Sequence, residues 1–267
     1  MFCDLHLHSD CSDGELSPAG LLTTIAAAGV RVAALTDHDT VEGVDRARAR
    51  AAECGVHLVS GIEMTAYTPG RVVHVLGLGI RLDNSGLRAA NGVASRVWSQ
   101  NQERWIKALS LSGASVSWSR DFADHPVRLP VLIERLCRRG VAGGDPHRCY
   151  QNFLLYFDGL PRRAYADLPT PEQAAAIIRA AGGLAILAHP RRLGDEGMIR
   201  QLLDQVDGLE AMYAAYSSLQ RRQLRTLARR TGKLYSGGSD YHGFFQAAYE
   251  NPRFQMPPSL AAYLKIV

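Results

Sequence analysis

The chain alternates short apolar segments with longer amphipathic ones, and this alternation limits its possible folds more than any other feature. Apolar runs typical of strands occur at 1–8, 30–38, 56–64, 71–80, 183–190, 208–213 and 233–242. Helical patterns separate most of these runs and occur at 18–28, 40–55, 170–181, 196–205 and 217–231. Strands that alternate with helices are typical of a parallel sheet covered by helices. The sequence therefore predicts an α/β fold with seven strands.

Residues 85–165 interrupt this alternation. The segments 85–112 and 128–157 have helical patterns, and the break near 120–128 is expected to be a linker. We therefore predict one domain from 1–84 and 166–267, with 85–165 inserted as a helical unit that shapes the substrate pocket. The tail from 243 is aromatic and proline-rich, with one short helix expected at its end.

Composition excludes several classes of protein. The 267 residues carry a net charge of +4 from scattered basic residues, which permits an anionic ligand without indicating a nucleic-acid protein. No apolar run reaches about 18 residues and no secretory signal is recognisable, so we expect neither a membrane span nor a membrane partner. The five cysteines form no CxxC motif, which favours reduced thiols and a cytoplasmic location.

Histidines and carboxylates collect where the predicted strands end. They are His6 and His8, Asp37 and His38, Glu63, His74 within the fourth strand, His189, and Asp240 with His242. The carboxyl ends of parallel strands meet at one edge of a sheet or barrel, so these side chains are expected to lie together. Residues i and i+2 of a strand point to the same side, so each closely spaced pair can bind one ion.

Such a cluster is costly to bury unless a cation compensates its charges. Imidazoles and carboxylates without a thiolate pattern suit manganese, iron or zinc better than calcium or magnesium. The candidate ligands exceed what one ion needs, so we expect two or three divalent ions, manganese first and iron or zinc as alternatives. Glu63 lies midway through the set and is the best candidate for a bridging ligand.

Six segments with these residues occur in an order that resembles the PHP (polymerase and histidinol phosphatase) family of metal-dependent phosphoesterases. The segments are DLHLHSDCSDG, TDHDT, GIEM, VVHVLGLG, LAHPRR and GGSDYHG. The nearest likeness is to its stand-alone branch, whose members remove phosphate from nucleotides or trim short oligonucleotides. The resemblance implies a distorted seven-stranded (β/α) barrel with a helical insertion after the fourth strand.

The resemblance also implies three metal positions. By it, the first ion would be held by His6, His8, Glu63 and Asp240, the second by Glu63, His74 and His189, and the third by Asp13, His38 and His242. Every position has the expected residue type. Gly14 is expected to permit the sharp loop that turns Asp13 back toward the site.

The expected chemistry is attack on phosphorus by a hydroxide that bridges two of the ions. We expect Glu63, Asp37 and Arg191 to serve catalysis, with Asp37 orienting a ligand or water. Arginine suits phosphate because its planar guanidinium matches two oxygens. The substrate-binding candidates are Arg128, Arg163, Arg191 and Arg192, and Arg162 is considered beside Arg163.

Three functions remain open from the sequence. The first is hydrolysis of a phosphomonoester of a small metabolite or nucleotide, such as a 3′,5′-bisphosphonucleoside. The second is an exonuclease that trims short 5′-phosphorylated oligonucleotides, and the third is a metal-bound domain that serves a protein partner. No obligate protein partner is evident. Aromatic residues of the insertion could stack on bases.

Several conspicuous residues have ordinary explanations. We expect structural or surface roles for His57, His125 and His147, and loop or helix-cap roles for Asp10 and Asp39. The basic segment 220–233 is expected to be an outer helix with a solvated basic face, because Leu224 and Leu227 give it an apolar side.

Overall fold

The structure is a computed structural model that describes residues 1–122, 128–243 and 248–266. His125 and most of the linker predicted at 120–128 lie outside these ranges. No helix in the described ranges is long and apolar enough to cross a membrane.

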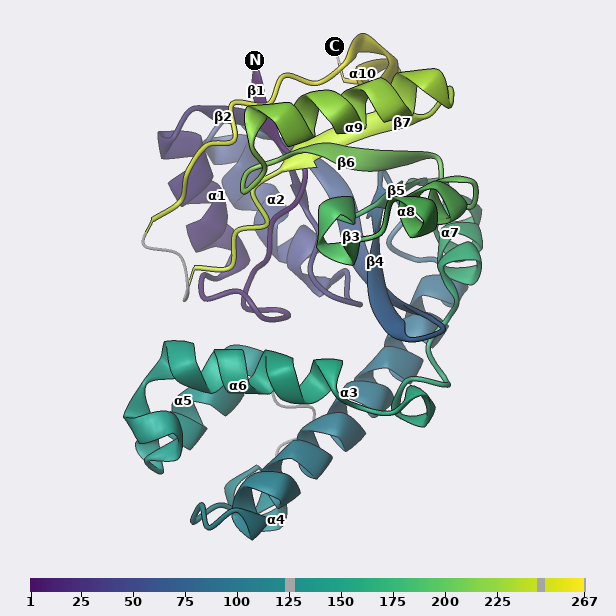
Figure 1. The fold of residues 1–267 in the computed structure, drawn as a ribbon. Helices are drawn as coiled ribbons and strands as arrows, with labels where there is room; N and C mark the ends of the chain where they lie inside the picture. The colour runs from purple at the N-terminus through teal and green to yellow at the C-terminus, as the bar shows by residue number, and fades with distance from the viewer. Residues whose placement is uncertain (123–127, 244–247, 267) are drawn as a thin grey trace.

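The seven predicted strands form one sheet in chain order (Figure 1). They are β1 (Phe2–Asp4), β2 (Val30–Leu35), β3 (His57–Thr68), β4 (Arg71–Leu78), β5 (Leu184–Leu187), β6 (Gly208–Tyr213) and β7 (Leu234–Gly238). Helices predicted between them are α1 (Pro18–Ala27), α2 (Glu42–Glu53), α7 (Pro171–Ala180), α8 (Glu196–Leu203) and α9 (Ser218–Arg230), and α10 (Pro258–Tyr263) is the short helix of the tail. The predicted α/β class is confirmed.

The sheet is not parallel throughout, which corrects the prediction. β1–β2, β2–β3, β5–β6 and β6–β7 pair in parallel, whereas β4 is antiparallel to both β3 and β5. Only two residues connect β3 to β4, between Thr68 and Arg71. A connection this short can form a hairpin but cannot make the crossover that a parallel pair requires.

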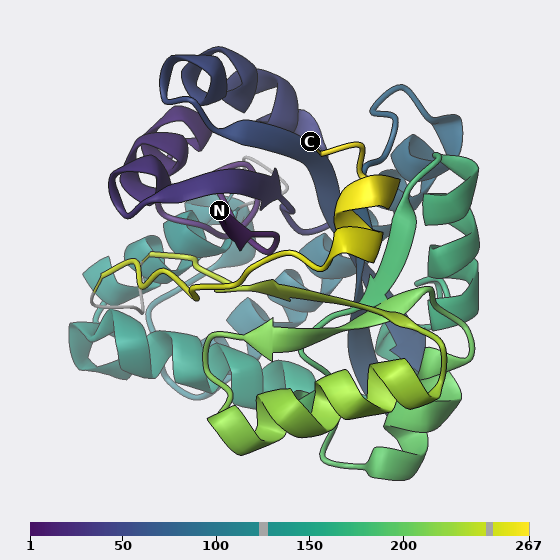
Figure 2. The same cartoon turned by 90° about the horizontal axis from the view of Figure 1, so that it is seen from above.

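Backbone hydrogen bonds link the segments after β1 and β7, in agreement with the predicted distorted barrel. The backbone N–H of Leu5 donates to Gly237 O over 3.1 Å, and that of Asp240 donates to His6 O over 2.9 Å. The N–H of His8 donates to Tyr241 O over 3.1 Å. These bonds place the first and last strands side by side, and the view from above shows the curled sheet (Figure 2).

A helical unit follows the fourth strand, as predicted. It comprises α3 (Ser85–Leu111), α4 (Trp118–Asp121), α5 (Leu129–Arg138) and α6 (Pro146–Asp158), and it has an apolar core of its own that includes Trp105, Leu132 and Phe153. Figure 1 shows α3 leaving the barrel and α6 returning beneath the loops that follow the strands. The unit therefore faces the edge where the polar residues were expected.

Candidate metal centre

All nine predicted ligands converge at one end of the barrel. His6, His8 and Asp13 follow β1, His38 follows β2, Glu63 lies in β3, His74 in β4, His189 follows β5, and Asp240 and His242 follow β7. Two of them, His189 and Asp240, have positive φ angles of 28° and 56°. Such angles are costly for residues other than glycine, and they persist where the surrounding structure holds a functional side chain in place.

Glu63 lies at the centre of the cluster and is fully buried. Its Oε2 is 3.0 Å from His6 Nε2 and 3.1 Å from His8 Nε2. Its Oε1 is 3.1 Å from His74 Nδ1 and 3.2 Å from His189 Nε2. Each oxygen thus faces a different pair of histidines, which is the arrangement that a bridging carboxylate requires.

Asp240 completes the first of these groups. Its Oδ1 lies 3.3 Å from His6 Nε2 and 3.2 Å from His8 Nε2. One ligand atom from each of His6, His8, Glu63 and Asp240 lies within 4.8 Å of the others. This is the residue set that the family resemblance implies for the first ion.

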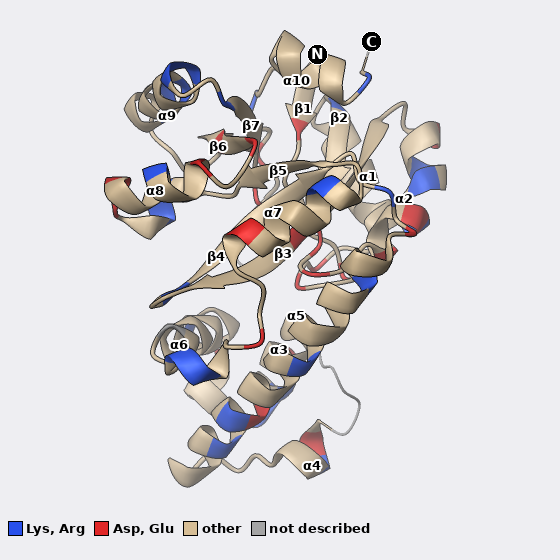
Figure 3. Cartoon of the chain, turned by 90° about the vertical axis from the view of Figure 1, so that its right-hand side faces the viewer, with Lys and Arg blue, Asp and Glu red and all other residues tan. Residues whose placement is uncertain are grey.

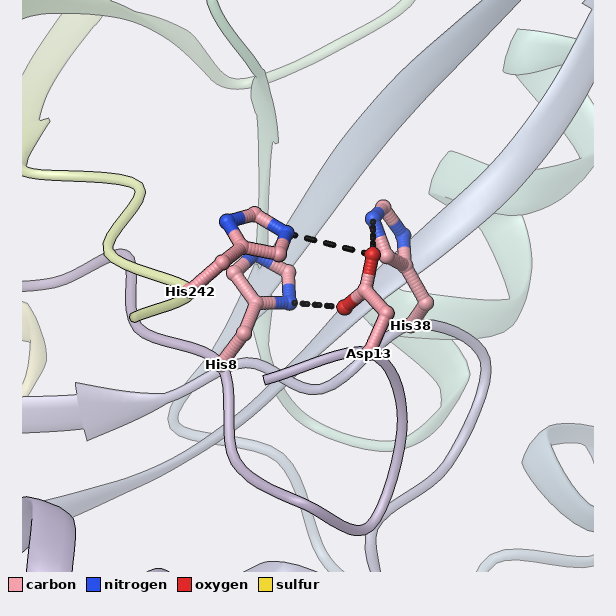
Figure 4. Close-up of side chains that lie close together, drawn as sticks. All are labelled: His8, Asp13, His38 and His242. Carbon is pink, nitrogen blue, oxygen red and sulfur yellow. Dashed lines mark ion pairs between the residues drawn. The ribbon is translucent and has the colours of Figure 1, made fainter. Parts of the chain in front are cut away.

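Asp13, in the loop after β1, lies close to His8, His38 and His242 (Figure 4). Its Oδ2 is 3.2 Å from His242 Nε2 and 3.6 Å from His38 Nε2, and its Oδ1 is 3.4 Å from His8 Nδ1. These four residues form a second compact group of ligand atoms. His8 thus adds a nitrogen to the three residues implied for the third ion.

A third group combines His38, Glu63 and His74. His189 lies beside it, with Nε2 3.3 Å from His74 Nδ1. The second implied position, at Glu63, His74 and His189, therefore lies next to His38 as well.

The cluster contains buried ring nitrogens without hydrogen bonds, whose lone pairs could coordinate a cation. His8 is 1% exposed, yet within the described residues neither ring nitrogen makes a hydrogen bond, and the same holds for His38 Nδ1. Buried polar atoms are normally satisfied, so unpaired nitrogens that converge on carboxylates indicate a missing partner. Neutral imidazoles and carboxylates are the donors that manganese, iron and zinc take, so the residues fit divalent ions.

Electrostatics in the cluster favour a cation. Burial raises the pKa values of Asp13, Glu63 and Asp240, but the surrounding histidines outweigh it and hold them well below their usual range. Burial lowers the pKa values of His6 and His8, but nearby carboxylates raise them well above the usual value. Without metal, protons on these imidazoles balance the carboxylates; metal ions can replace them.

Glu210 supports two ligands, and our sequence analysis missed it. Its Oε1 is 3.1 Å from His6 Nδ1, and its Oε2 accepts a 2.9 Å hydrogen bond from the backbone N–H of His189. A carboxylate that contacts the second nitrogen of a ligating imidazole fixes the orientation and tautomer of the ring. The sequence feature that could have identified Glu210 is its position as the single acidic residue in the apolar strand GLEAMY.

Asp37, expected to act in catalysis, faces the loop that carries Asp13. Its carboxylate accepts hydrogen bonds of 2.7 Å from Ser9 N–H, Ser9 Oγ and Ser12 Oγ. Asp37 is buried and does not line the cavity described below. Its contacts therefore position the loop, and direct contact with a substrate or water stays a prediction.

A cavity of about 650 Å³ lies between the cluster and the helical unit. One wall holds His38, Glu63, His74 and Asp240, and the opposite wall holds Trp98 of α3 with Tyr150 and Phe153 of α6, among others. The site thus places an aromatic surface opposite the potential metal positions. A phosphorylated molecule with a flat base could contact both walls at once.

Asp39 connects the two walls, although its sequence position indicated a loop or cap residue. It is 9% exposed, lines the cavity and has φ 54°. Its carboxylate accepts hydrogen bonds from Thr65 N–H at 2.7 Å, Thr65 Oγ1 at 2.6 Å and Trp98 Nε1 at 3.4 Å. Its contacts therefore position Trp98 against the barrel.

Two of the four predicted substrate-binding arginines line the cavity and two do not. Arg128 and Arg192 line the cavity, and Arg192 Nη2 donates a 2.6 Å hydrogen bond to the hydroxyl of Tyr213. Arg191 and Arg163 are not among the lining residues. The Arg191 guanidinium contacts Glu196 Oε1 at 3.1 Å and Gln223 Oε1 at 2.7 Å, which gives no support to the expectation that it faces the reacting phosphate.

Comparisons with known proteins agree with this geometry. A family model described as the PHP domain matches residues 4–117. A 5′-3′ exoribonuclease of Haemophilus influenzae is 32% identical over 90% of this chain and 89% of its own length. A 3′,5′-nucleoside bisphosphate phosphatase of Chromobacterium violaceum is 31% identical over 90% of this chain and 86% of its own. A solved structure from Bifidobacterium adolescentis, 23% identical, matches the fold with a TM-score of 0.80 over 98% of this chain and 96% of its own.

Proposed function

Because the chain belongs to the PHP domain family and is a hydrolase of phosphoester bonds, we propose that its substrate is a phosphorylated nucleotide. A 3′,5′-bisphosphonucleoside is the first candidate, since one similar protein is named for that activity. The single observation that carries the proposal is the cavity with the ligand cluster on one wall and Trp98, Tyr150 and Phe153 on the other. Its 650 Å³ suits a small ligand.

The nine clustered residues are proposed to hold two or three divalent ions, with manganese the first candidate and iron or zinc the alternatives. When bound, such ions supply Lewis acidity, which makes water a nucleophile near neutral pH and neutralises phosphate oxygens. Glu63 holds two groups of histidines together through its separate oxygens. Glu210 fixes the imidazole of His6 and the backbone of His189.

Arg192 is proposed to bind a phosphate oxygen that lies outside the metal shell. It is on the cavity wall, and its Nη2 lies 3.3 Å from Asp240 Oδ2. The hydroxyl of Tyr213 donates to the same Oδ2 over 2.9 Å and accepts from Arg192. Tyr213 thereby fixes both a proposed ligand and the guanidinium, which keeps the cation oriented toward the cavity.

The helical unit at 85–165 is proposed to supply the wall that recognises the base. Arg128, at the start of α5, lies 3.4 Å from Asp10 Oδ2 and also contacts the Asp10 carbonyl. This contact and the hydrogen bond from Trp98 to Asp39 connect the helical unit to two loops of the barrel formed by 1–84 and 166–267.

The second candidate is an exonuclease that trims short 5′-phosphorylated oligonucleotides. The exoribonuclease of Haemophilus influenzae is as similar to this chain as the phosphatase is. The two functions would share the cluster and differ in how the mouth of the cavity accepts a strand.

A substrate panel tests the proposal. The manganese-loaded protein is assayed for phosphate release from a 3′,5′-bisphosphonucleoside, a 5′-mononucleotide and ribose 5-phosphate, and for shortening of a 5′-phosphorylated RNA. We expect highest kcat/KM on a nucleotide, abolished in Glu63→Ala. Preferential shortening of RNA would favour the exonuclease, and no turnover of any compound by metal-loaded protein would contradict both.

Two neighbouring arginines give a matched pair for the same assay. Arg192→Ala should lower kcat/KM by about 10-fold or more, because a hydrogen bond to a charged phosphate contributes about 1.5–3 kcal/mol. Arg191→Ala should leave turnover of the small substrate nearly unchanged. Equal losses in the two variants would contradict the assignment to Arg192.

A further inference from the structure

A second cavity of about 410 Å³ lies on the outside of the barrel between α8 and α9. Four arginines line it and Glu196 is the single carboxylate among its lining residues. Arg191 comes from the turn after β5, Arg200 from α8, and Arg222 and Arg230 from α9. Figure 3 shows basic segments on both helices. We call this cavity the α8–α9 cleft.

Three of the four arginines of the cleft have no partner among the described residues, whereas the Nη atoms of Arg191 contact Glu196 and Gln223. Among the described residues, the guanidinium groups of Arg200, Arg222 and Arg230 take part in no hydrogen bond or ion pair, and the Nε of Arg191 is buried without a partner. Like charges that converge from three elements repel one another, and an anion bound between them would relieve this repulsion. A merely solvated basic face, which the sequence predicted for 220–233, would not bring arginines of two helices to one hollow.

The shape of the α8–α9 cleft indicates an extended anion. Arg222, Thr226 and Arg230 are spaced i, i+4 and i+8 on α9, so the two arginines are about 12 Å apart along the helix. Ile199, Leu224 and Leu227 form an apolar part of the lining, and Leu219 beside them is 53% exposed. Guanidinium groups bind phosphate oxygens and an exposed leucine can contact a sugar or base, so a phosphodiester strand fits better than a single small anion.

The α8–α9 cleft is next to the candidate metal centre. Arg191 lines the cleft and Arg192, the following residue, lines the metal-side cavity. Tyr216 lines neither cavity. Its hydroxyl accepts a 2.7 Å hydrogen bond from the backbone N–H of Arg191, and its ring centroid lies 4.9 Å from that of Tyr213. The turn Pro190–Leu193 therefore separates the two cavities by the width of one chain segment.

We propose that the α8–α9 cleft binds the backbone of a single-stranded oligonucleotide whose terminal phosphate lies at the metal centre. This inference rests on the second candidate of the proposed function, the exonuclease, for the identity of the ligand, a phosphorylated nucleotide chain. The cleft would give longer substrates additional affinity without changing the reacting site.

Binding of a 3′-fluorescein-labelled RNA of eight nucleotides, measured by fluorescence anisotropy in EDTA, tests the cleft separately from metal chemistry. Arg222→Glu and Arg230→Glu should each raise Kd by about 5- to 30-fold, because each replaces an attraction with a repulsion. The slope of log Kd against log salt should fall by about 0.7 for each lost contact with a single strand. Arg229→Glu, an exposed arginine of α9 outside the cleft, changes the charge equally and should alter Kd less than twofold.

Three further results decide the inference. Turnover of a 5′-mononucleotide by the manganese-loaded variants should stay within twofold of the parent, since the cleft lies outside the reacting site. Equal effects of Arg229→Glu and Arg222→Glu would overturn the proposal. Unlabelled RNA should also compete better, per phosphate, than millimolar inorganic phosphate or mononucleotide. Equal competition would overturn the proposal, because the cleft would then be a small-anion site. If the enzyme hydrolyses no substrate, the proposed function fails while the anisotropy result still stands.

Discussion

At the scale of single residues, the candidate centre depends on side chains that contact the proposed ligands without being ligands themselves. Glu210 is fully buried and contacts both His6 and the backbone of His189. Tyr213 contacts Asp240 and Arg192 in a similar way. The orientation of several proposed ligands is thus set by neighbours that come from β6.

Replacing Glu210 should weaken the centre without removing any proposed ligand. Glu210→Gln should lower manganese affinity by about 10- to 100-fold, the usual effect of removing a carboxylate that supports a ligating histidine. Bound metal can be counted by elemental analysis after dialysis at several manganese concentrations. The control Glu196→Gln makes the same change at an exposed site, and a similar loss there would argue against a specific role.

Gly14 is required for close approach of two chain segments. Its φ is not positive, but a Cβ at this position would lie 2.4 Å from the carbonyl oxygen of His8. The expected sharp loop therefore depends on the missing side chain, because backbone packs directly against the glycine.

Gly14→Ala should destabilise the protein by about 1–3 kcal/mol, as forced overpacking does, and lower its metal content by displacing Asp13. Denaturant unfolding and elemental analysis measure the two effects. Gly92→Ala in α3, where a Cβ would meet nothing closer than 3.8 Å, is the matched control. An unchanged free energy of unfolding in Gly14→Ala would show that the loop can shift at little cost.

At the scale of elements, α3 and α6 supply aromatic residues to the cavity wall opposite the cluster. Trp98 donates to Asp39 and stacks at 5.4 Å on Phe157, while Phe153 packs 4.1 Å from Phe157. The aromatic wall is thus part of the core of the helical unit as well as of the cavity. If these rings contact the substrate, as proposed, its recognition and the packing of this unit depend on the same side chains.

Trp98→Ala should lower kcat/KM for a nucleotide by about 5- to 100-fold, because stacking of a base on an aromatic side chain contributes about 1–3 kcal/mol. The value for ribose 5-phosphate should change much less, since that compound has no base. Trp118→Ala removes a tryptophan of the same unit that does not line the cavity. Parallel losses on both substrates would indicate that Trp98 only maintains the fold.

The order of elements and the ligand types were predictable because both depend on local sequence. Ser17 accepts the N–H of Gly20 at the start of α1, and the helix ends before Gly29 at φ 88°, so local residues set both ends of this helix. The direction of β4 was not predictable from an apolar run. The hairpin of β3 and β4 is recognisable only from the two-residue connection between them.

At the scale of the whole molecule, one end of the barrel gathers ionisable groups from most of its strands. Carboxylates from three segments meet imidazoles from five, and five of the nine groups are buried, namely His6, His8, Glu63, His189 and Asp240. Burial lowers the pKa values of His38 and His189, whereas nearby carboxylates outweigh burial and raise those of His6 and His8, so only some of the imidazoles carry protons that balance the carboxylates without metal.

Manganese binding at pH 7 should therefore release protons. Carboxylates raise the pKa values of His6 and His8 well above the usual value, so both are charged without metal, whereas ligation requires the neutral ring. Titration calorimetry in buffers with different ionisation enthalpies counts the protons. The number released should fall as pH rises through the raised pKa values, because the imidazoles are then already neutral. Heats that do not depend on the buffer would contradict this account.

The sequence by itself determined the order of strands and helices, the helical insertion after the fourth strand and the gathering of histidines and carboxylates at strand ends. Local periodicity and parallel topology suffice for these features. Only the tertiary structure decided that Arg192 faces the cavity while Arg191 faces the α8–α9 cleft, and that Glu210 and Asp39 belong to the site. Consecutive residues of a 3₁₀ turn point about 120° apart, so the packing around the turn Pro190–Leu193 selects which guanidinium reaches which cavity.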